Sequence, residues 1–280
     1  MTRILALVAV TAIWGWTFVV VKDAIASFPI AAFLAYRFAL AAIVLLPALL
    51  RAKRAAILAG LPIGAFLAAG YLFQTLGLAR TRPSDAGIVT GLFVVFTPVL
   101  DRAIFGVRAP RATLAAATLA LPGLALLVAG SPLELGAGDL VVMIGSVSFA
   151  LQIVFLSRVA AAHDPLALTA AQVTLAAAVF GVLAALPTGG GLAAVPPPDV
   201  LVAIAITGVL ATSLGFLIQT WAQRHLAATP TAIVLATEPA WATLFGIALA
   251  GDAFPPARAV GAALLLAAPV VATVLPRRLP

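Results

Sequence analysis

The sequence contains no cysteine and few charged residues. Its 280 residues include 16 Lys and Arg, 9 Asp and Glu, and 2 His. The absence of Cys excludes disulfides, thiol nucleophiles and Cys metal sites. The histidines, His163 and His225, lie in predicted loops without a catalytic carboxylate or Ser arrangement, and no Gly-rich phosphate loop follows a strand. We therefore expect no enzyme activity, no cofactor, no metal and no ATP-driven step in this chain.

Apolar residues are abundant instead. Hydrophobic residues make up 64% of the chain and charged residues 9%, and the mean hydropathy is +1.21. A soluble domain carries roughly 25% charged and about 45–50% apolar residues. So much apolar surface cannot be hidden from water, so most of the chain is expected to lie in lipid. The net charge of +7 sits in short clusters between apolar runs, as in membrane proteins, and does not indicate nucleic-acid binding.

Ten apolar runs are long enough to cross a bilayer, which requires about 20 mostly apolar residues. They are separated by charges or by Pro/Gly clusters, and they predict helices over residues 4–24, 30–50, 56–79, 84–104, 111–130, 138–158, 165–187, 199–223, 229–250 and 257–276. We therefore expect an all-α integral membrane protein with ten transmembrane helices and no separate soluble domain.

The basic residues favour one side of the membrane. With a cytoplasmic N-terminus, eleven of them lie inside: Arg3, Arg51, Lys53, Arg54, Arg102, Arg108, Arg111, Arg158, Arg224, Arg277 and Arg278. Four lie outside, namely Lys22, Arg80, Arg82 and Arg258, and Arg37 falls within the second helix. Cytoplasmic loops carry the excess of Lys and Arg, so this bias predicts that both termini are cytoplasmic.

The two halves of the sequence resemble each other. Residues 111–122 align without gaps with residues 258–269, and seven of the twelve positions are identical. Less common residues also pair in order: Pro29 with Pro165, Pro47 with Pro187, Tyr71, Gln74 and Thr75 with Phe216, Gln219 and Thr220, and Pro98 with Pro239. An odd number of helices per half would insert the halves in opposite directions, with a substrate site between them. We therefore predict two inverted five-helix repeats, 1–131 and 132–280, around a central cavity; chance similarity between Ala-rich helices is the alternative.

Several segments together resemble a known family. Residues 14–22, Trp-Gly-Trp-Thr-Phe-Val-Val-Val-Lys, are similar to the first-helix signature of the EamA-type branch of the drug/metabolite transporter superfamily. Later helices match through Pro29 with Tyr36-Arg37, Tyr71-x-x-Gln74-x-x-Gly77-Leu78, Ser84-x-Ala86 with Thr97-Pro98, and Glu238-Pro239-Ala240. The similarity spans nearly the whole chain and is greatest to the YddG-type amino-acid exporters. Asp101, and Gln172 in the place of Arg37, depart from the pattern and from strict symmetry between the halves.

The resemblance implies a secondary transporter that exports amino acids, aromatic ones included, and related small metabolites across the bacterial inner membrane by alternating access. A monomer is expected to suffice, with a small solute and lipid as partners. The alternative within the superfamily is a transporter of drugs, cationic metabolites or nucleotide sugars, with or without proton coupling. A membrane enzyme would need clustered ionisable groups at one face, which the sequence lacks. A channel usually repeats its filter about an axis along the membrane normal.

Ionisable groups inside apolar helices are costly, which makes them functional candidates. Glu238 lies in the ninth predicted helix just before a proline, and Arg37 is the nearest counter-charge. Either these residues bind the amino and carboxylate groups of a zwitterionic solute, or they form a structural pair between helices 2 and 9.

Neutral polar, aromatic and proline residues complete the predicted site. Gln74 and Gln219 occupy corresponding positions, and they either bind substrate or join helices. The other predicted substrate-binding residues are Trp14, Thr17, Tyr71, Thr97, Phe149, Gln152, Phe216 and Trp241. Pro98, Pro122, Pro239 and Pro269 are expected inside helices, either as hinges or as static bends.

Overall fold

The computed structural model describes residues 1–109, 120–127, 136–187, 191, 195–252 and 256–274. The regular structure in these ranges is entirely helical, which confirms the predicted all-α class there. The helices are α1 (Thr2–Ser27), α2 (Ile30–Leu50), α3 (Arg54–Leu78), α4 (Pro83–Thr90), α5 (Phe93–Phe105), α7 (Ala137–Val159), η1 (Ala160–Ala162), α8 (Pro165–Ala185), α9 (Pro198–Ala205), η3 (Ile206–Leu214), α10 (Gly215–Gln223), α11 (Ala228–Leu235), α12 (Glu238–Ala250) and α13 (Pro256–Val274). We refer to α1–α5 with residues 120–127 as the first half, and to α7–α13 as the second half.

Eight described stretches are long and apolar enough to cross a membrane. They are Thr2–Ser27, Ile30–Leu50, Arg54–Leu78, Pro83–Phe105, Ala137–Ala162, Pro165–Ala185, Pro198–Gln223 and Ala228–Ala250. Eight of the ten predicted spans are therefore found. Most of the fifth, 111–130, lies outside the described residues, although residues 120–127 are helical. The tenth corresponds to α13, whose apolar stretch Ala259–Ala268 is shorter than a full span.

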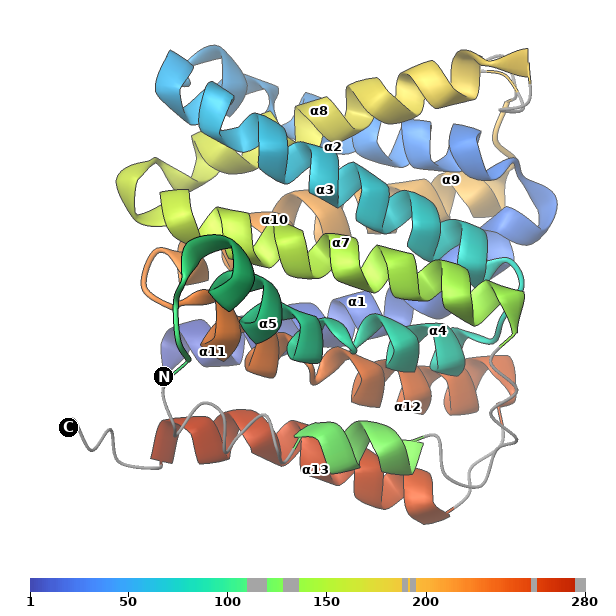
Figure 1. The fold of residues 1–280 in the computed structure, drawn as a ribbon. Coiled ribbons are helices and arrows are strands. Elements are labelled where there is room, and N and C mark those ends of the chain that lie inside the picture. The colour runs from blue at the N-terminus through green and yellow to red at the C-terminus, as the bar shows by residue number, and fades with distance from the viewer. Residues whose placement is uncertain (110–119, 128–135, 188–190, 192–194, 253–255, 275–280) are drawn as a thin grey trace.

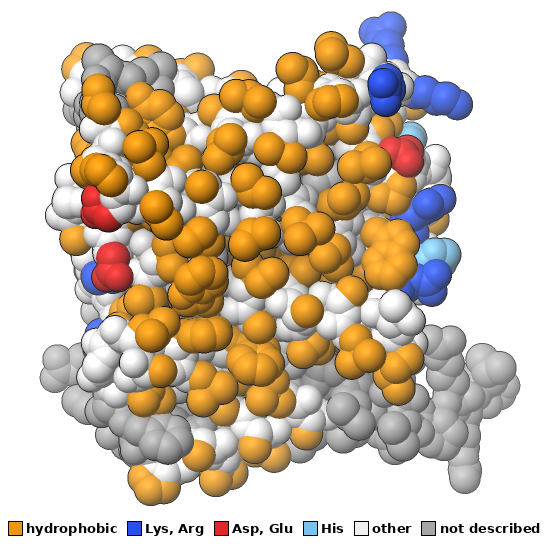
Figure 2. Space-filling view, turned by 180° about the vertical axis from the view of Figure 1, so that it is seen from behind, with side chains coloured by type: hydrophobic (Ala, Val, Ile, Leu, Met, Phe, Trp, Pro, Cys, Tyr) orange, Lys and Arg blue, Asp and Glu red, His pale blue; other side chains and the backbone are white. Residues whose placement is uncertain are grey.

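The helices lie side by side between two ends of the molecule, and α13 lies along one edge next to α12 (Figure 1). Large aliphatic side chains face outward along their length; Ile43, for example, is 66% exposed. Figure 2 shows this apolar surface over the middle of the bundle, with Lys and Arg gathered mainly at the end that carries the N-terminus. This surface suits lipid in the middle and water at the ends.

Local sequence sets where several helices begin. α8 starts at Pro165, and the Asp164 Oδ1 atom before it accepts a hydrogen bond of 2.9 Å from the Ala167 amide. α4 and α9 also start at prolines, Pro83 and Pro198. The first-turn amides have no partner within a helix, so proline loses nothing there, and an Asp cap satisfies one of the free amides.

The fourth and ninth predicted helices are each broken at the same place. α4 and α11 have 8 residues, α5 and α12 have 13 residues, and each pair is separated by two residues. α5 ends at Gly106 and α12 ends at Gly251, with φ of 69° and 72°, a left-handed conformation that glycine adopts without steric cost. Both predicted spans are therefore present, and each contains a two-residue turn at the corresponding place that the sequence did not predict.

The breaks also change the expected pairing of the prolines. Pro98 lies in the middle of α5, whereas Pro239 lies in the first turn of α12. Proline is tolerated there because its missing amide hydrogen would be unpaired in any case. When the breaks are aligned, Thr243 and not Pro239 corresponds to Pro98. Pro122 is exposed within helical residues 120–127. Pro269 lies within α13, and its side chain is outside the described part.

Glycines allow the helices to approach closely, and one such contact occurs in both halves. A Cβ atom on Gly70 of α3 would lie 2.6 Å from the Phe149 ring of α7. A Cβ atom on Gly215 of α10 would lie 2.8 Å from the Trp14 indole nitrogen of α1. Small residues at helix contacts favour packing in lipid. The contact of α3 with α7 therefore has a counterpart in the contact of α10 with α1.

Candidate functional site

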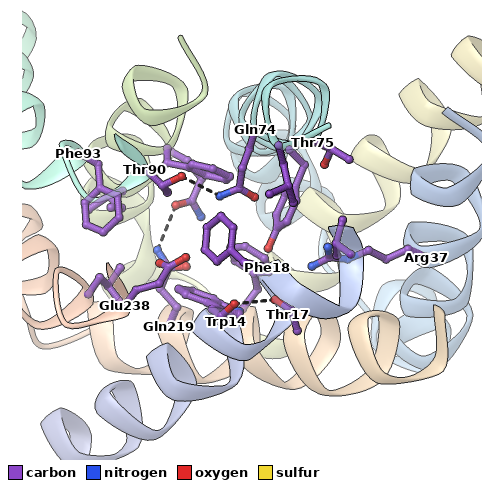
Figure 3. Close-up of a pocket in the computed structure, with 18 residues that line it drawn as sticks. Trp14, Thr17, Phe18, Arg37, Gln74, Thr75, Thr90, Phe93, Gln219 and Glu238 are labelled. Carbon is purple, nitrogen blue, oxygen red and sulfur yellow. Dashed lines mark hydrogen bonds between the residues drawn. The ribbon is translucent and has the colours of Figure 1, made fainter. Parts of the chain in front are cut away.

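A cavity lies between the two halves, near the middle of the helices (Figure 3). Its empty volume is about 590 Å³, but only about 40 Å³ is available to the centre of a water molecule, so the side chains leave a narrow space. Ten predicted residues line it: Trp14, Thr17, Arg37, Tyr71, Gln74, Phe149, Gln152, Phe216, Gln219 and Glu238. Residues far apart in the sequence are thus brought to one place.

Six aromatic side chains line the cavity, and the rings of four of them pack against one another. The ring centroids of Trp14 and Phe216 are 5.2 Å apart, and those of Tyr71 and Phe149 are 5.3 Å apart. Tyr71 and Phe216, at 5.9 Å, join the two pairs. The indole nitrogen of Trp14 donates a hydrogen bond of 2.8 Å to the Ala211 carbonyl oxygen in η3, which fixes the ring. Each half therefore contributes one ring to each pair.

A chain of buried amides lies beside these rings. Gln219 Nε2 donates to Gln152 Oε1 at 3.0 Å and to Gln223 Oε1 at 2.9 Å. Gln152 Nε2 donates in turn to Gln172 Oε1 at 3.1 Å. Gln219 Oε1 is buried and has no hydrogen-bond partner among the described residues. Since buried polar atoms are normally paired, this oxygen is available to accept a hydrogen bond from a solute.

The first half has a smaller polar group at the corresponding place. Gln74 Nε2 donates a hydrogen bond of 3.1 Å to Thr90 Oγ1 at the end of α4. Ser146 Oγ of α7 donates to the Thr90 carbonyl oxygen at 2.8 Å. The end of α4 is thereby held to α3 and α7 directly before the helix break.

Two charged side chains line opposite sides of the cavity (Figure 3). Arg37 of α2 is 2% exposed, and Glu238 is 6% exposed at the first residue of α12. In the described part of the chain the ion pairs are Arg82 with Asp85 and Arg158 with Asp101, and none joins Arg37 to Glu238. The structural pair considered for these two residues is therefore not formed.

Two predicted site residues do not line the cavity. Thr97 is fully buried, and its hydroxyl donates a hydrogen bond of 2.7 Å to the Phe93 carbonyl oxygen within α5. Trp241 packs against α1, where a Cβ atom on Gly15 would lie 2.5 Å from the Trp241 Cβ atom. Neither residue is part of the cavity wall.

The sequence did not reveal the cavity residues next to the helix breaks. Thr90, Phe93 and Leu235 line the cavity, but continuous helices were expected in both places. Phe18 lines it too, one helical turn after Trp14. Gly106 and Gly251, which follow α5 and α12, are the signal that could have aligned the two helices. Aligning them places the two breaks at corresponding positions of the two halves.

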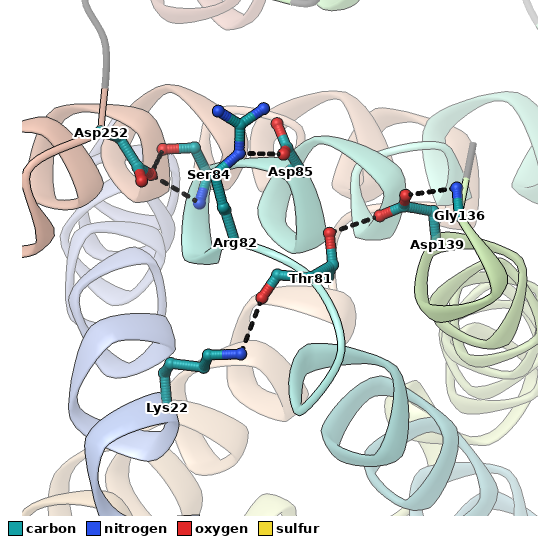
Figure 4. A network of polar contacts seen from close by, with 8 residues as sticks. All are labelled: Lys22, Thr81, Arg82, Ser84, Asp85, Gly136, Asp139 and Asp252. Carbon is teal, nitrogen blue, oxygen red and sulfur yellow. Dashed lines mark hydrogen bonds and ion pairs between the residues drawn. The ribbon is translucent and has the colours of Figure 1, made fainter. Parts of the chain in front are cut away.

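At one end of the bundle, polar contacts join the helices around an open pocket, which we call the mouth (Figure 4). The mouth is lined by Lys22, Asp23, Ala79, Arg80, Thr81, Arg82, Pro83, Asp85, Gly136, Asp139, Leu249, Ala250 and Asp252. Lys22 Nζ donates to the carbonyl oxygens of Leu78, Ala79 and Thr81 at 2.7, 3.1 and 3.0 Å. Thr81 Oγ1 donates to Asp139 Oδ1 at 2.7 Å. These bonds join α1 to the end of α3, and the loop after α3 to α7.

Helices α4 and α12 meet at the same mouth. The Ser84 hydroxyl donates a hydrogen bond to the Asp252 carboxylate just after α12 (Figure 4). Arg82 Nε lies 2.7 Å from Asp85 Oδ2, and this hydrogen bond raises the pKa of the Arg82 guanidinium. The mouth therefore carries acidic groups from both halves and basic groups from the first half.

The mouth lies directly next to the cavity. Val21 and Leu78 line the cavity, and their neighbours Lys22 and Ala79 line the mouth. The volume available to the centre of a water molecule is about 870 Å³ in the mouth.

Direct bonds join the helices at the other end. Arg158 pairs with the buried Asp101, and Gln223 Nε2 donates to Ser157 Oγ at 2.6 Å. These bonds join α5 to α7, and α10 to α7, at the end that carries the N-terminus.

Comparisons with known proteins agree with this architecture. The EamA-like transporter family matches residues 1–129 and again residues 136–274. An uncharacterized transporter of Archaeoglobus fulgidus is 28% identical over 267 residues, which cover 95% of this chain and 84% of that protein. A solved crystal structure superposes with a TM-score of 0.76 at 20% identity, over 98% of this chain and 97% of the other, which shows a shared fold. The chain belongs to the EamA-like transporter family.

Proposed function

We propose that this transporter exports amino acids, aromatic ones included, and related small metabolites across the bacterial inner membrane by alternating access. The observation that carries the proposal is the cavity between the halves, with its six aromatic side chains, its amides and one charge of each sign. Aromatic rings pack favourably on one another, and amides both donate and accept hydrogen bonds. Such a wall suits a small solute with an apolar body and polar ends.

We further propose that the halves, 1–131 and 132–280, insert in opposite directions as five-helix repeats, with both termini cytoplasmic. Three observations support this topology. The family matches the chain twice, and the broken helices have the same lengths in both halves. The contact of Gly70 with Phe149 also has a counterpart in the contact of Gly215 with Trp14. The basic end in Figure 2 is the end predicted to be cytoplasmic.

The helix breaks offer a way for the halves to move. Interrupted helices are tolerated in membranes where they line a cavity, and transporters use them at substrate sites. Thr90 and Phe93 flank the first break, Leu235 and Glu238 flank the second, and all four line the cavity. We propose that the segments around Pro98 and Pro239 act as hinges there, with Pro122 and Pro269 as further hinges in the outer helices.

One observation favours a second candidate, an aromatic or other organic cation. Glu238 is the one carboxylate among the described residues that line the cavity, and the aromatic rings around it suit a cationic ligand. A nucleotide sugar fits less well, because Arg37 is the one basic residue in the same set and a diphosphate calls for several.

The test is uptake by proteoliposomes that contain the purified full chain. Radiolabelled phenylalanine, leucine, glutamate and an aromatic cation are compared with and without a pH gradient. The proposal expects uptake of phenylalanine and leucine above that of empty liposomes. Uptake of the cation with no amino-acid uptake would replace the proposal with the second candidate.

A further inference from the structure

Arg37 is a buried charge without an anionic partner. It is 2% exposed, and no ion pair involves it in the part of the chain that the structure describes. A guanidinium stays protonated in proteins, so it cannot relieve its burial by losing the proton. An unpaired charge in a membrane helix is costly and calls for an opposite charge or a cavity.

The contacts of Arg37 hold its guanidinium in place but leave one side free. Its Nε donates a hydrogen bond of 2.9 Å to Thr212 Oγ1, and its Cζ lies 4.4 Å from the centre of the Tyr71 ring. Nη2 is buried without a hydrogen-bond partner. The side chain points into the cavity, on the side opposite Glu238 (Figure 3). An arginine held in this way is prepared to bind a planar anion through its free edge.

The corresponding residue in the second half has no unpaired side-chain nitrogen. Gln172 stands in the place of Arg37, and its amide is engaged on both sides: Oε1 accepts from Gln152, and Nε2 donates to Thr220 Oγ1 at 3.3 Å. The two halves therefore differ at this position, with a guanidinium whose Nη2 has no hydrogen-bond partner in one and a fully engaged neutral amide in the other.

We propose that Arg37 forms a carboxylate subsite of the cavity, so that the transported solute carries one carboxylate and binds with that end toward α2 and Tyr71. This inference rests on the proposed role of the cavity as the substrate site. The body of the solute lies along the rings of Tyr71 and Phe216. Its other end faces Glu238 across the cavity, where an ammonium group would find its counter-charge.

The test compares two ligands of the same shape, phenylacetate and its neutral amide, phenylacetamide. Binding to the full chain in detergent is followed by tryptophan fluorescence, which Trp14 in the cavity wall reports. We expect phenylacetate to bind the wild type about 10- to 100-fold more tightly than phenylacetamide, the usual effect of hydrogen bonds to a charged group. Equal binding of the two ligands to the wild type overturns the proposal, and this comparison requires no variant to fold.

The variants test the residue itself. Arg37→Gln copies the residue of the second half, and it should abolish the preference for phenylacetate while phenylacetamide binding changes little. Arg37→Lys should keep part of the preference. Arg51→Gln, at an exposed position outside the cavity, should keep all of it. A folded Arg37→Gln protein that still prefers phenylacetate would assign the carboxylate to another group.

Flux measurements separate this subsite from the proposed function. If the wild type takes up no phenylalanine in proteoliposomes but prefers phenylacetate in a way that depends on Arg37, amino-acid export is rejected and the subsite is kept. Phenylalanine uptake without that preference would keep the export and reject the subsite.

Discussion

The two halves of the molecule agree in their backbone and differ in their charges. Each half breaks one span after 8 residues, restarts it for 13 and ends it at a left-handed glycine. At the restart the first half has Phe93 and the second half has Glu238. On α2 and α8 the first half has Arg37 and the second half has Gln172. The framework around the cavity is thus repeated, while each half places one charged residue, of opposite sign, in the cavity wall.

The aromatic side chains of the cavity wall are arranged alike in the two halves, as the backbone is. The ring pair of Trp14 with Phe216 has its counterpart in Phe149 with Tyr71, with nearly equal separations of 5.2 and 5.3 Å. Packing contacts of this kind depend on shape, which two similar halves reproduce. Hydrogen bonds and charges depend on individual residues, and these residues differ between the two halves. This difference predicts that packing variants act equally in the two halves and polar variants act unequally.

The largest effect is expected from glycines at the reciprocal helix contacts. Gly70→Val would force a side chain into the Phe149 ring, and Gly215→Val into the Trp14 ring. Overpacking typically costs about 1–3 kcal/mol, and both displaced rings line the cavity. Both variants should lower the melting temperature in detergent and reduce uptake to near background. Gly181→Val is the control, since nothing lies within 4 Å of its added Cβ atom. A large effect in one half only would show that the contacts are not equivalent.

A large effect on transport without loss of the fold is expected from Glu238→Gln. The variant keeps the size of the side chain but removes the cavity carboxylate. Loss of a hydrogen bond to a charged group costs about 1.5–3 kcal/mol, so uptake of amines and amino acids should fall about tenfold or more at low substrate concentration. Membrane insertion should be normal. Thr97→Val, which alters a buried residue outside the cavity, serves as the control. Unchanged uptake by Glu238→Gln at every pH would exclude a role for this carboxylate.

A moderate and unequal effect is expected from the two corresponding glutamines. Gln219→Leu leaves the acceptors on Gln152 and Gln223 without their donor, whereas Gln74→Leu breaks one bond to Thr90. A buried group left unpaired costs about 1–3 kcal/mol. The melting temperature and the KM for uptake should therefore change more in Gln219→Leu than in Gln74→Leu. Equal changes would contradict the structural difference between the two amides.

The smallest effect is expected from the glycines that end the broken spans. A left-handed residue other than glycine costs about 1–2 kcal/mol. No atom lies within 4 Å of an added Cβ atom at Gly106 or Gly251, so backbone conformation is the main cost of an alanine at either position. Gly106→Ala and Gly251→Ala should each lower the free energy of unfolding by that amount, as measured by denaturation in mixed micelles. A difference of several-fold between them would indicate that the two ends are not alike.

The sequence predicted the helices and many of the residues that line the cavity, because both follow from apolar patterning. The spans follow from run length, and costly polar residues within them, such as Gln74, Gln219 and Glu238, line the cavity. Thr97 and Trp241 do not line the cavity, because a residue in a span can face either the cavity or the surrounding helices. The breaks were missed because Gly91-Leu92 and Ala236-Thr237 lie within apolar runs that continue through them.

The central claim is that the two halves lie in the membrane in opposite directions. The chain contains no cysteine, so single cysteines can be introduced without other changes. Arg82, after α3, and Arg224, after α10, follow corresponding helices and are both exposed. A membrane-impermeant maleimide should label Arg82→Cys from the periplasmic side and Arg224→Cys only after the cytoplasmic side is opened. Labelling of both cysteines from the same side would contradict the claim.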